Sequence, residues 1–226
     1  MASKSFYALV AGVGPGTGRA TALRFAQKYP VVLLARRPES YEEAVADIKK
    51  AGGQAIGITA DVSDPTNLKN ALASIDKELP GSRLAAAVFN VNISMGASFF
   101  HFAQATLPLL QKSVPDSEYP PTLIITGATA SVKGSAQFGS FAAGKWALRG
   151  LGQSLAREFH PQGIHVAHAV IDGVIDIPRT KDWQVNNGAE DGKIKPEIAE
   201  TYWFLHTQHR SAFTHEVDIR PYVEKF

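Results

Sequence analysis

The 226 residues include 23 lysines and arginines, 21 aspartates and glutamates and 7 histidines, which leaves a formal net charge of +2. This balance, with basic residues scattered along the chain, argues against nucleic acid or a membrane surface as a partner. The chain has no cysteine, which excludes disulfides, thiol nucleophiles and cysteine-held metal sites. We find no apolar run of signal-peptide or membrane-spanning type, so we expect a cytoplasmic protein.

Apolar runs of strand length alternate with segments of helical periodicity. The runs lie at 6–10, 31–35, 55–58, 84–89, 123–125 and 165–171, and the helical segments at 17–29, 41–51, 65–79, 97–111, 142–159 and 196–207. Strands that are apolar throughout are typical of a parallel sheet with both faces covered. The alternation therefore predicts a three-layer, doubly wound α/β sheet, the Rossmann fold, as a single domain over residues 1–226. The polar segment 177–195 is either a substrate lid or a disordered loop.

A glycine-rich turn joins the first predicted strand to the first predicted helix, with the sequence Ala-Gly-Val-Gly-Pro-Gly-Thr-Gly over residues 11–18. Glycine allows a tight turn and a close approach of the backbone to a diphosphate, and the N-terminus of the following helix attracts the anion. Because the turn stands at a strand-to-helix junction, we interpret it as a nucleotide site rather than an ordinary turn. Its contact residues are Gly12, Gly14, Gly16, Thr17 and Gly18.

Two arginines, Arg36 and Arg37, end the second strand at the position where a fold selective for NAD carries an acid. A guanidinium group there can hold a 2′-phosphate, which favours NADP(H) as the cofactor, although a solvated charge pair is the alternative. Asp61 and Val62 follow the third strand. There, the carboxylate either accepts a hydrogen bond from the adenine amine or belongs to a helix-entry cluster.

With these motifs the chain resembles the short-chain dehydrogenase/reductase family over nearly its whole length. The glycine turn is similar to the family's cofactor turn, Asp61-Val62 to its adenine contact, and the segment 89–92 to a degraded form of its Asn-Asn-Ala-Gly strand end. The resemblance implies that Asn90 and Gly173 also contact the cofactor. The segment 141–145, Phe-Ala-Ala-Gly-Lys, lies where the family has Tyr-x-x-x-Lys.

The catalytic tyrosine of the family is absent, because Phe141 stands in its place. The resemblance implies that the tyrosine hydroxyl gives a proton to the carbonyl as hydride arrives, while the lysine lowers the tyrosine pKa and bonds the ribose. Phe141 has no such proton, whereas Lys145 keeps the ribose contact. The family's serine maps onto Ala128, so Thr126, Thr129 or Ser131 would replace it only if the turn were repacked. We therefore place the catalytic centre at Lys145, Phe141 and Thr126.

Three further features have more than one interpretation. Asp172, where the family has proline, is either a substitute proton carrier or a cap of the next turn. The connection at 91–96 is short, so either the chain has a true deletion or a disordered segment is missing from the sequence. His206-x-x-His209 and His215 have metal-like spacing without an accompanying acid, and we expect a solvated helix end and no metal site.

The sequence supports two functional hypotheses. The first is an NADP(H)-dependent oxidoreductase of short-chain type that acts on an unknown small carbonyl or alcohol through a nonstandard catalytic centre. The second is a catalytically silent NADP(H)-binding sensor or scaffold protein. The resemblance implies a homo-oligomer, a dimer or a tetramer, in either case.

Overall fold

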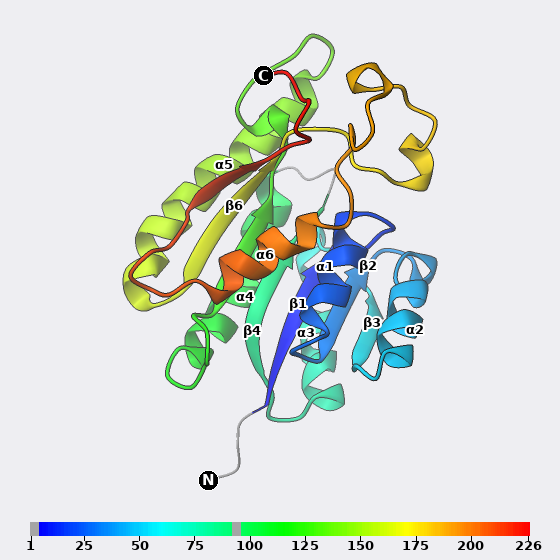
Figure 1. Ribbon diagram of the computed structural model, residues 1–226. Coiled ribbons are helices and arrows are strands. Elements are labelled where there is room, and N and C mark those ends of the chain that lie inside the picture. Colours follow the sequence, from blue (N-terminus) through cyan, green and yellow to red (C-terminus); the bar gives the residue numbers. More distant parts are fainter. Residues whose placement is uncertain (1–4, 92–95) are drawn as a thin grey trace.

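The computed structural model describes residues 5–91 and 96–226, and its centre is a parallel sheet of seven strands in the order β3-β2-β1-β4-β5-β6-β7 (Figure 1). The strands are β1 Phe6–Ala11, β2 Val31–Ala35, β3 Ala55–Thr59, β4 Arg83–Phe89, β5 Thr122–Thr126, β6 His165–Ile171 and β7 Glu216–Ile219. The chain therefore has the single-domain doubly wound fold predicted from the sequence.

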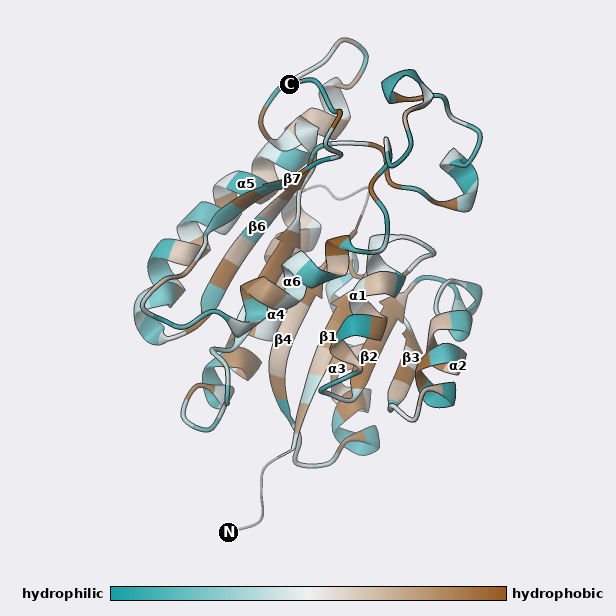
Figure 2. Ribbon diagram, in the orientation of Figure 1, coloured by the Kyte–Doolittle hydropathy of each residue, from teal (hydrophilic) through white to brown (hydrophobic). Residues whose placement is uncertain are grey.

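In residues 5–91 and 96–226, six α-helices cover the two faces of the sheet. One face carries α3 Pro65–Glu78, α4 Gly96–Ser113 and α5 Gly139–Phe159, and the other carries α1 Thr17–Phe25, α2 Glu42–Lys50 and α6 Ile198–Thr207. Short 3-10 helices lie at η1 Pro38–Ser40, η2 Thr129–Ser131, η3 His160–Gln162, η4 Pro178–Thr180 and η5 Asn186–Gly188. Figure 2 shows hydrophobic residues along the strands and hydrophilic ones on the outer faces of helices such as α2, as burial on both faces of the sheet requires.

Two elements differ from the sequence prediction. Helix α1 ends at Phe25 rather than at Tyr29, because Pro30 disfavours helical backbone at the residue before it. Tyr29 is still buried, and its hydroxyl lies 3.0 Å from Nε2 of His206. Strand β7 was not predicted. It lies at the edge of the sheet, and polar and apolar side chains alternate along its four residues, which are partly exposed.

The polypeptide reverses its direction across the sheet between β1 and β4, and the carboxyl ends of the strands meet at one edge. In Figure 1 the segment 177–195 extends beyond this edge, above α1 and β2. A β-bridge between Ile175 and Ile194 closes the base of the segment, and η4 and η5 lie within it. The segment thus has a bridged base and two short helical turns.

Two further predictions concern a membrane span and the short connection at 91–96. In the described ranges, no helix combines the length and apolar character needed to cross a membrane. The question of a deletion or a missing segment falls on residues 92–95, which lie outside the described residues.

Candidate active site

A cleft of about 830 Å³ opens at the carboxyl edge of the sheet and brings together every site residue predicted from the sequence. Its lining includes Gly12, Gly14, Gly16, Thr17, Gly18, Arg36, Arg37, Asp61, Val62, Asn90, Thr126, Phe141, Lys145 and Gly173. Clefts at the switch point of a doubly wound sheet are the usual ligand sites of such folds.

The glycines of the turn serve different purposes. Gly12 has a φ of +87°, and a Cβ atom on it would lie 2.3 Å from the backbone oxygen of Asn90. Asn90 in turn donates a hydrogen bond of 2.8 Å from Nδ2 to the Gly12 carbonyl oxygen. A Cβ atom on Gly14, by contrast, would meet no atom within 4 Å. Gly12 therefore shapes the turn, and Gly14 leaves the cleft open to a ligand.

The first turn of α1 offers donors to an anion. In the described structure, Oγ1 of Thr17 is buried without a hydrogen-bond partner, although Thr17 lines the cleft. The first N–H groups of a helix also lack intrahelical acceptors. A buried hydroxyl that makes no hydrogen bond is costly. A phosphate oxygen can accept a hydrogen bond from the Thr17 hydroxyl and from the N–H groups at the helix N-terminus.

The ends of the neighbouring strands β2 and β3 add charges of both signs to the cleft. Arg36 and Arg37 are exposed at the end of β2, within the cleft lining. Asp61 accepts hydrogen bonds from the backbone N–H and the hydroxyl of Ser63, and these bonds lower the pKa of its carboxyl group, with a smaller effect of the Arg36 charge. Asp61 is thus a carboxylate at neutral pH, able to accept a further hydrogen bond.

Lys145 is buried at the reaction end of the cleft, with 4% of its surface exposed. Its Nζ donates a hydrogen bond of 3.0 Å to the Thr126 carbonyl oxygen and lies 5.8 Å from the centroid of the Phe141 ring. Burial lowers the pKa of Lys145 to about 8, because the ammonium form is poorly solvated there.

The hydroxyl groups near this lysine are already engaged. Thr126 Oγ1 lies 2.7 Å from the hydroxyl of the buried Tyr202, so the hydroxyl of this last residue of β5 is shared with α6. Ser131 Oγ accepts a hydrogen bond of 3.1 Å from the backbone N–H of Ala128.

Asp172 is also committed to other groups. The Thr129 hydroxyl donates a hydrogen bond to it, and Nη1 of Arg220 lies 3.4 Å from its other oxygen. It faces a second, smaller pocket rather than the main cleft. In the described residues the carboxylate of Asp172 thus contacts a hydroxyl and a guanidinium group, and no bond to a backbone N–H of the following turn accompanies them.

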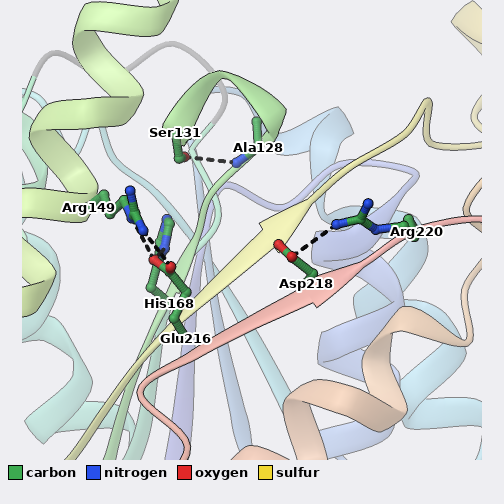
Figure 3. Close-up of polar contacts among 7 residues, drawn as sticks. All are labelled: Ala128, Ser131, Arg149, His168, Glu216, Asp218 and Arg220. Atoms are coloured by element: carbon green, nitrogen blue, oxygen red, sulfur yellow. Dashed lines mark hydrogen bonds and ion pairs between the residues drawn. The ribbon is translucent and has the colours of Figure 1, made fainter. Parts of the chain in front are cut away.

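A polar network that the sequence did not reveal lies beside the turn after β5 (Figure 3). Arg149 on α5 holds Glu216 of β7 through two hydrogen bonds of 2.8 Å, and Glu216 also accepts one of 2.9 Å from Nδ1 of His168. Burial lowers the pKa of His168, so the ring is neutral at pH 7, while the bonds from Arg149 lower the pKa of Glu216 to about 2. The His168 ring lies directly against Gly127, where a Cβ atom would be 2.2 Å from Nε2.

The histidines after β6 form no metal site in the described residues. The expectation of a solvated helix end is wrong for His206, which is completely buried. Its Nδ1 lies 3.0 Å from the Thr122 hydroxyl, and burial lowers its pKa to about 3. His206 is therefore a neutral residue of the core that links α6 to β5.

Comparison with known proteins identifies the architecture around this cleft. The sequence pattern of the family described as short chain dehydrogenase matches residues 7–106 and 82–187. The chain belongs to this family. A short-chain dehydrogenase/reductase of Armillaria gallica is 31% identical over 217 residues, which cover 88% of this chain and 82% of that protein.

Solved structures of other short-chain dehydrogenases share the fold. The crystal structure of one from Rhodopseudomonas palustris has a TM-score of 0.74 and 29% identity, covering 95% of this chain and 99% of that one. A metagenomic short-chain oxidoreductase in complex with NADP has a TM-score of 0.76 at 21% identity, covering 97% and 99% of the two chains, and shows the likeness of fold alone.

The chain thus belongs to a family of oxidoreductases that bind nicotinamide cofactors. The unpartnered Thr17 hydroxyl and the open space at Gly14 fit the diphosphate of such a cofactor. Phe141 and Ala128, which the sequence prediction assigns to the family's tyrosine and serine positions, line the same cleft.

Proposed function

We propose that this chain is an NADP(H)-dependent oxidoreductase that interconverts a small carbonyl compound and its alcohol through a nonstandard catalytic centre. The observation that carries the proposal is the convergence in one cleft of the glycine turn, the arginine pair and the buried Lys145. An arginine pair without a competing acid at the end of β2 supports NADP(H) over NAD(H), because a guanidinium group binds a 2′-phosphate with two parallel hydrogen bonds.

In this proposal different residues of the cleft would contact different parts of the cofactor. The N-terminus of α1 and the Thr17 hydroxyl would hold the diphosphate, and Arg36 and Arg37 the 2′-phosphate. Asp61 would accept the adenine amine, and Lys145 would bond the nicotinamide ribose. The bound cofactor supplies a hydride donor or acceptor at its nicotinamide ring.

The segment 177–195 serves in this proposal as the substrate lid. Ile177, Arg179, Thr180 and Trp183 of this segment line the cleft. A Cβ atom on Gly16 would lie 2.8 Å from Cγ2 of Ile177, so the segment packs directly over the glycine turn. The exposed indole of Trp183 offers an apolar surface to a substrate.

A titration followed by single-turnover kinetics tests the proposal. NADPH should bind more tightly than NADH, and Arg36→Asp should reverse this order because it replaces the phosphate-binding cation by an acid. Equal affinities in the unaltered protein would contradict the assignment of NADP(H). Mixing the NADPH complex with a panel of aldehydes and ketones should then show loss of nicotinamide absorbance within a single turnover.

The second candidate is a catalytically silent NADP(H)-binding protein. It is favoured by the absence of a hydroxyl on Phe141 and by the engagement of the hydroxyls at Thr126 and Ser131. Both candidates bind NADPH, so affinity does not separate them. Bound NADPH that transfers no hydride to any carbonyl of the panel would favour the silent protein.

A further inference from the structure

Lys145 has unused hydrogen-bonding capacity at the reaction end of the cleft. An ammonium group has three N–H donors. In the described part of the chain, Lys145 makes one hydrogen bond, to the Thr126 carbonyl oxygen, and no acidic side chain forms an ion pair with it. The other flank of the ammonium group is the Phe141 ring, which accepts no ordinary hydrogen bond. Two N–H donors are therefore available to a ligand.

Three of the side chains that the sequence offered as substitute donors are engaged with other groups or lie outside the main cleft. The Thr126 hydroxyl is paired with Tyr202, the Ser131 hydroxyl is completely buried, and Asp172 faces away from the main cleft. Phe141, which carries no hydroxyl group, lies beside Lys145. The position of Lys145 thus combines access to the cleft with protons that can be transferred.

We propose that Lys145 itself is the proton donor for carbonyl reduction, an inference that rests on the proposed function. As the nicotinamide of NADPH delivers hydride to the carbonyl carbon, the C=O π bond breaks and its electron pair takes a proton from Nζ. The products are the alcohol, NADP⁺ and a neutral Lys145 amine. The amine regains its proton from water at the open side of the cleft.

The titration behaviour of Lys145 supports this role. Burial lowers its pKa to about 8, and no charged or titratable side chain of the described residues contributes to the change. A proton donor acts best when its pKa lies near the working pH, and a lysine in water, with a pKa of about 10.4, is a much weaker acid. The apolar wall beside Lys145 thus makes its ammonium group the stronger acid.

Two measurements on the full chain test the proposal. Side-chain NMR of isotope-labelled lysines, without nucleotide, should show one ammonium group that titrates near pH 8 and disappears in Lys145→Arg. Single-turnover hydride transfer at saturating NADPH should be constant at low pH and fall about tenfold per pH unit above the same pKa, because the donor form is lost.

The variants sharpen the comparison. Lys145→Arg keeps a cation for the ribose but has a pKa above about 12, so hydride transfer should fall by at least about a hundredfold while NADPH still binds. Lys133→Arg, an exposed lysine outside the main cleft, is the matched control and should leave the rate and its pH profile unchanged.

The outcomes separate this inference from the proposed function. Hydride transfer that persists in Lys145→Arg, or a rate profile whose pKa differs from that of the lysine resonance, overturns the role of Lys145 alone. Absence of hydride transfer from bound NADPH overturns both. If Lys145→Arg does not fold, the unaltered protein still tests the role of Lys145. Agreement between the pKa from lysine NMR and the pKa from the rate profile supports this role, and disagreement overturns it.

Discussion

Glu216 is the residue on which the polar network beside the β5 turn depends. It accepts two hydrogen bonds from Arg149 and one from His168, so Glu216→Gln keeps the shape of the side chain but removes the charge and one acceptor position. The buried His168 ring then competes with Arg149 for a single amide oxygen. We expect this change to destabilise the fold.

The size of the effect follows from the pKa of Glu216. Its lowering from 4.5 to about 2 corresponds to about 3 kcal/mol of stabilisation in the charged form. Because the side chain keeps 27% of its exposure, solvent screening reduces this figure, and we expect a loss of about 1–2 kcal/mol in Glu216→Gln at pH 7. A carboxylate with a lowered pKa stabilises the fold above about pH 4.5, and this contribution is lost as the pH falls towards 2. The difference between the two proteins should therefore shrink over that range.

Urea unfolding of both proteins between pH 7 and pH 3.5 measures the difference. Asp218→Asn on the same strand is the matched control, since Asp218 is half-exposed and pairs with Arg220 at the surface. It should cost no more than about 0.5 kcal/mol at pH 7. A loss in Glu216→Gln no larger than in the control, or one that is independent of pH, would refute the reasoning.

Three further predictions concern the cleft. Gly12→Ala should destabilise the fold by more than about 1 kcal/mol, because the residue has a positive φ and its Cβ atom would collide with a backbone oxygen. Gly14→Ala should unfold like the unaltered protein but bind NADPH weakly. Equal unfolding midpoints for the two variants would contradict this. Tyr202→Phe should cost about 1–3 kcal/mol in urea unfolding by leaving the buried Thr126 hydroxyl unpaired, and adding Thr126→Val should recover part of the loss. Phe141→Tyr should raise or preserve hydride transfer, because its hydroxyl, with an ordinary pKa of about 10, would stand beside the buried lysine; a large loss of rate with NADPH bound would argue against this geometry.

Local patterns carried the prediction of the fold and of the nucleotide half of the site. Short segments at the ends of strands allowed this prediction. Examples are the turn at Gly12 and Gly14, after the first strand, and Arg36, after the second. The prediction of strands succeeded where the run is apolar throughout, which includes the partly exposed edge strand β3. It failed for β7, whose edge position allows polar residues to alternate with apolar ones.

Contacts between distant segments were beyond sequence reasoning. His168 stands within an apolar run, which gave no indication that its ring meets Glu216, 48 residues further along the chain. The hydroxyl of Thr126 was available to catalysis on sequence grounds, and its use by Tyr202 follows from the docking of α6 on the sheet, a contact across 76 residues. In the same way His206 seemed solvated only because the partners that bury it lie far away in sequence.

The reversal of the chain between β1 and β4 assigns the two parts of the cleft to different halves of the sequence. The nucleotide wall is built from the ends of β1, β2 and β3, and the reaction wall from β5, α5 and the segment after β6. The two walls meet at Asn90, which donates a hydrogen bond to the Gly12 carbonyl oxygen, and at Gly16, which packs against Ile177. Substitutions at Gly16 or Ile177 would therefore act on both walls at once, which couples the shape of the segment 177–195 to that of the glycine turn.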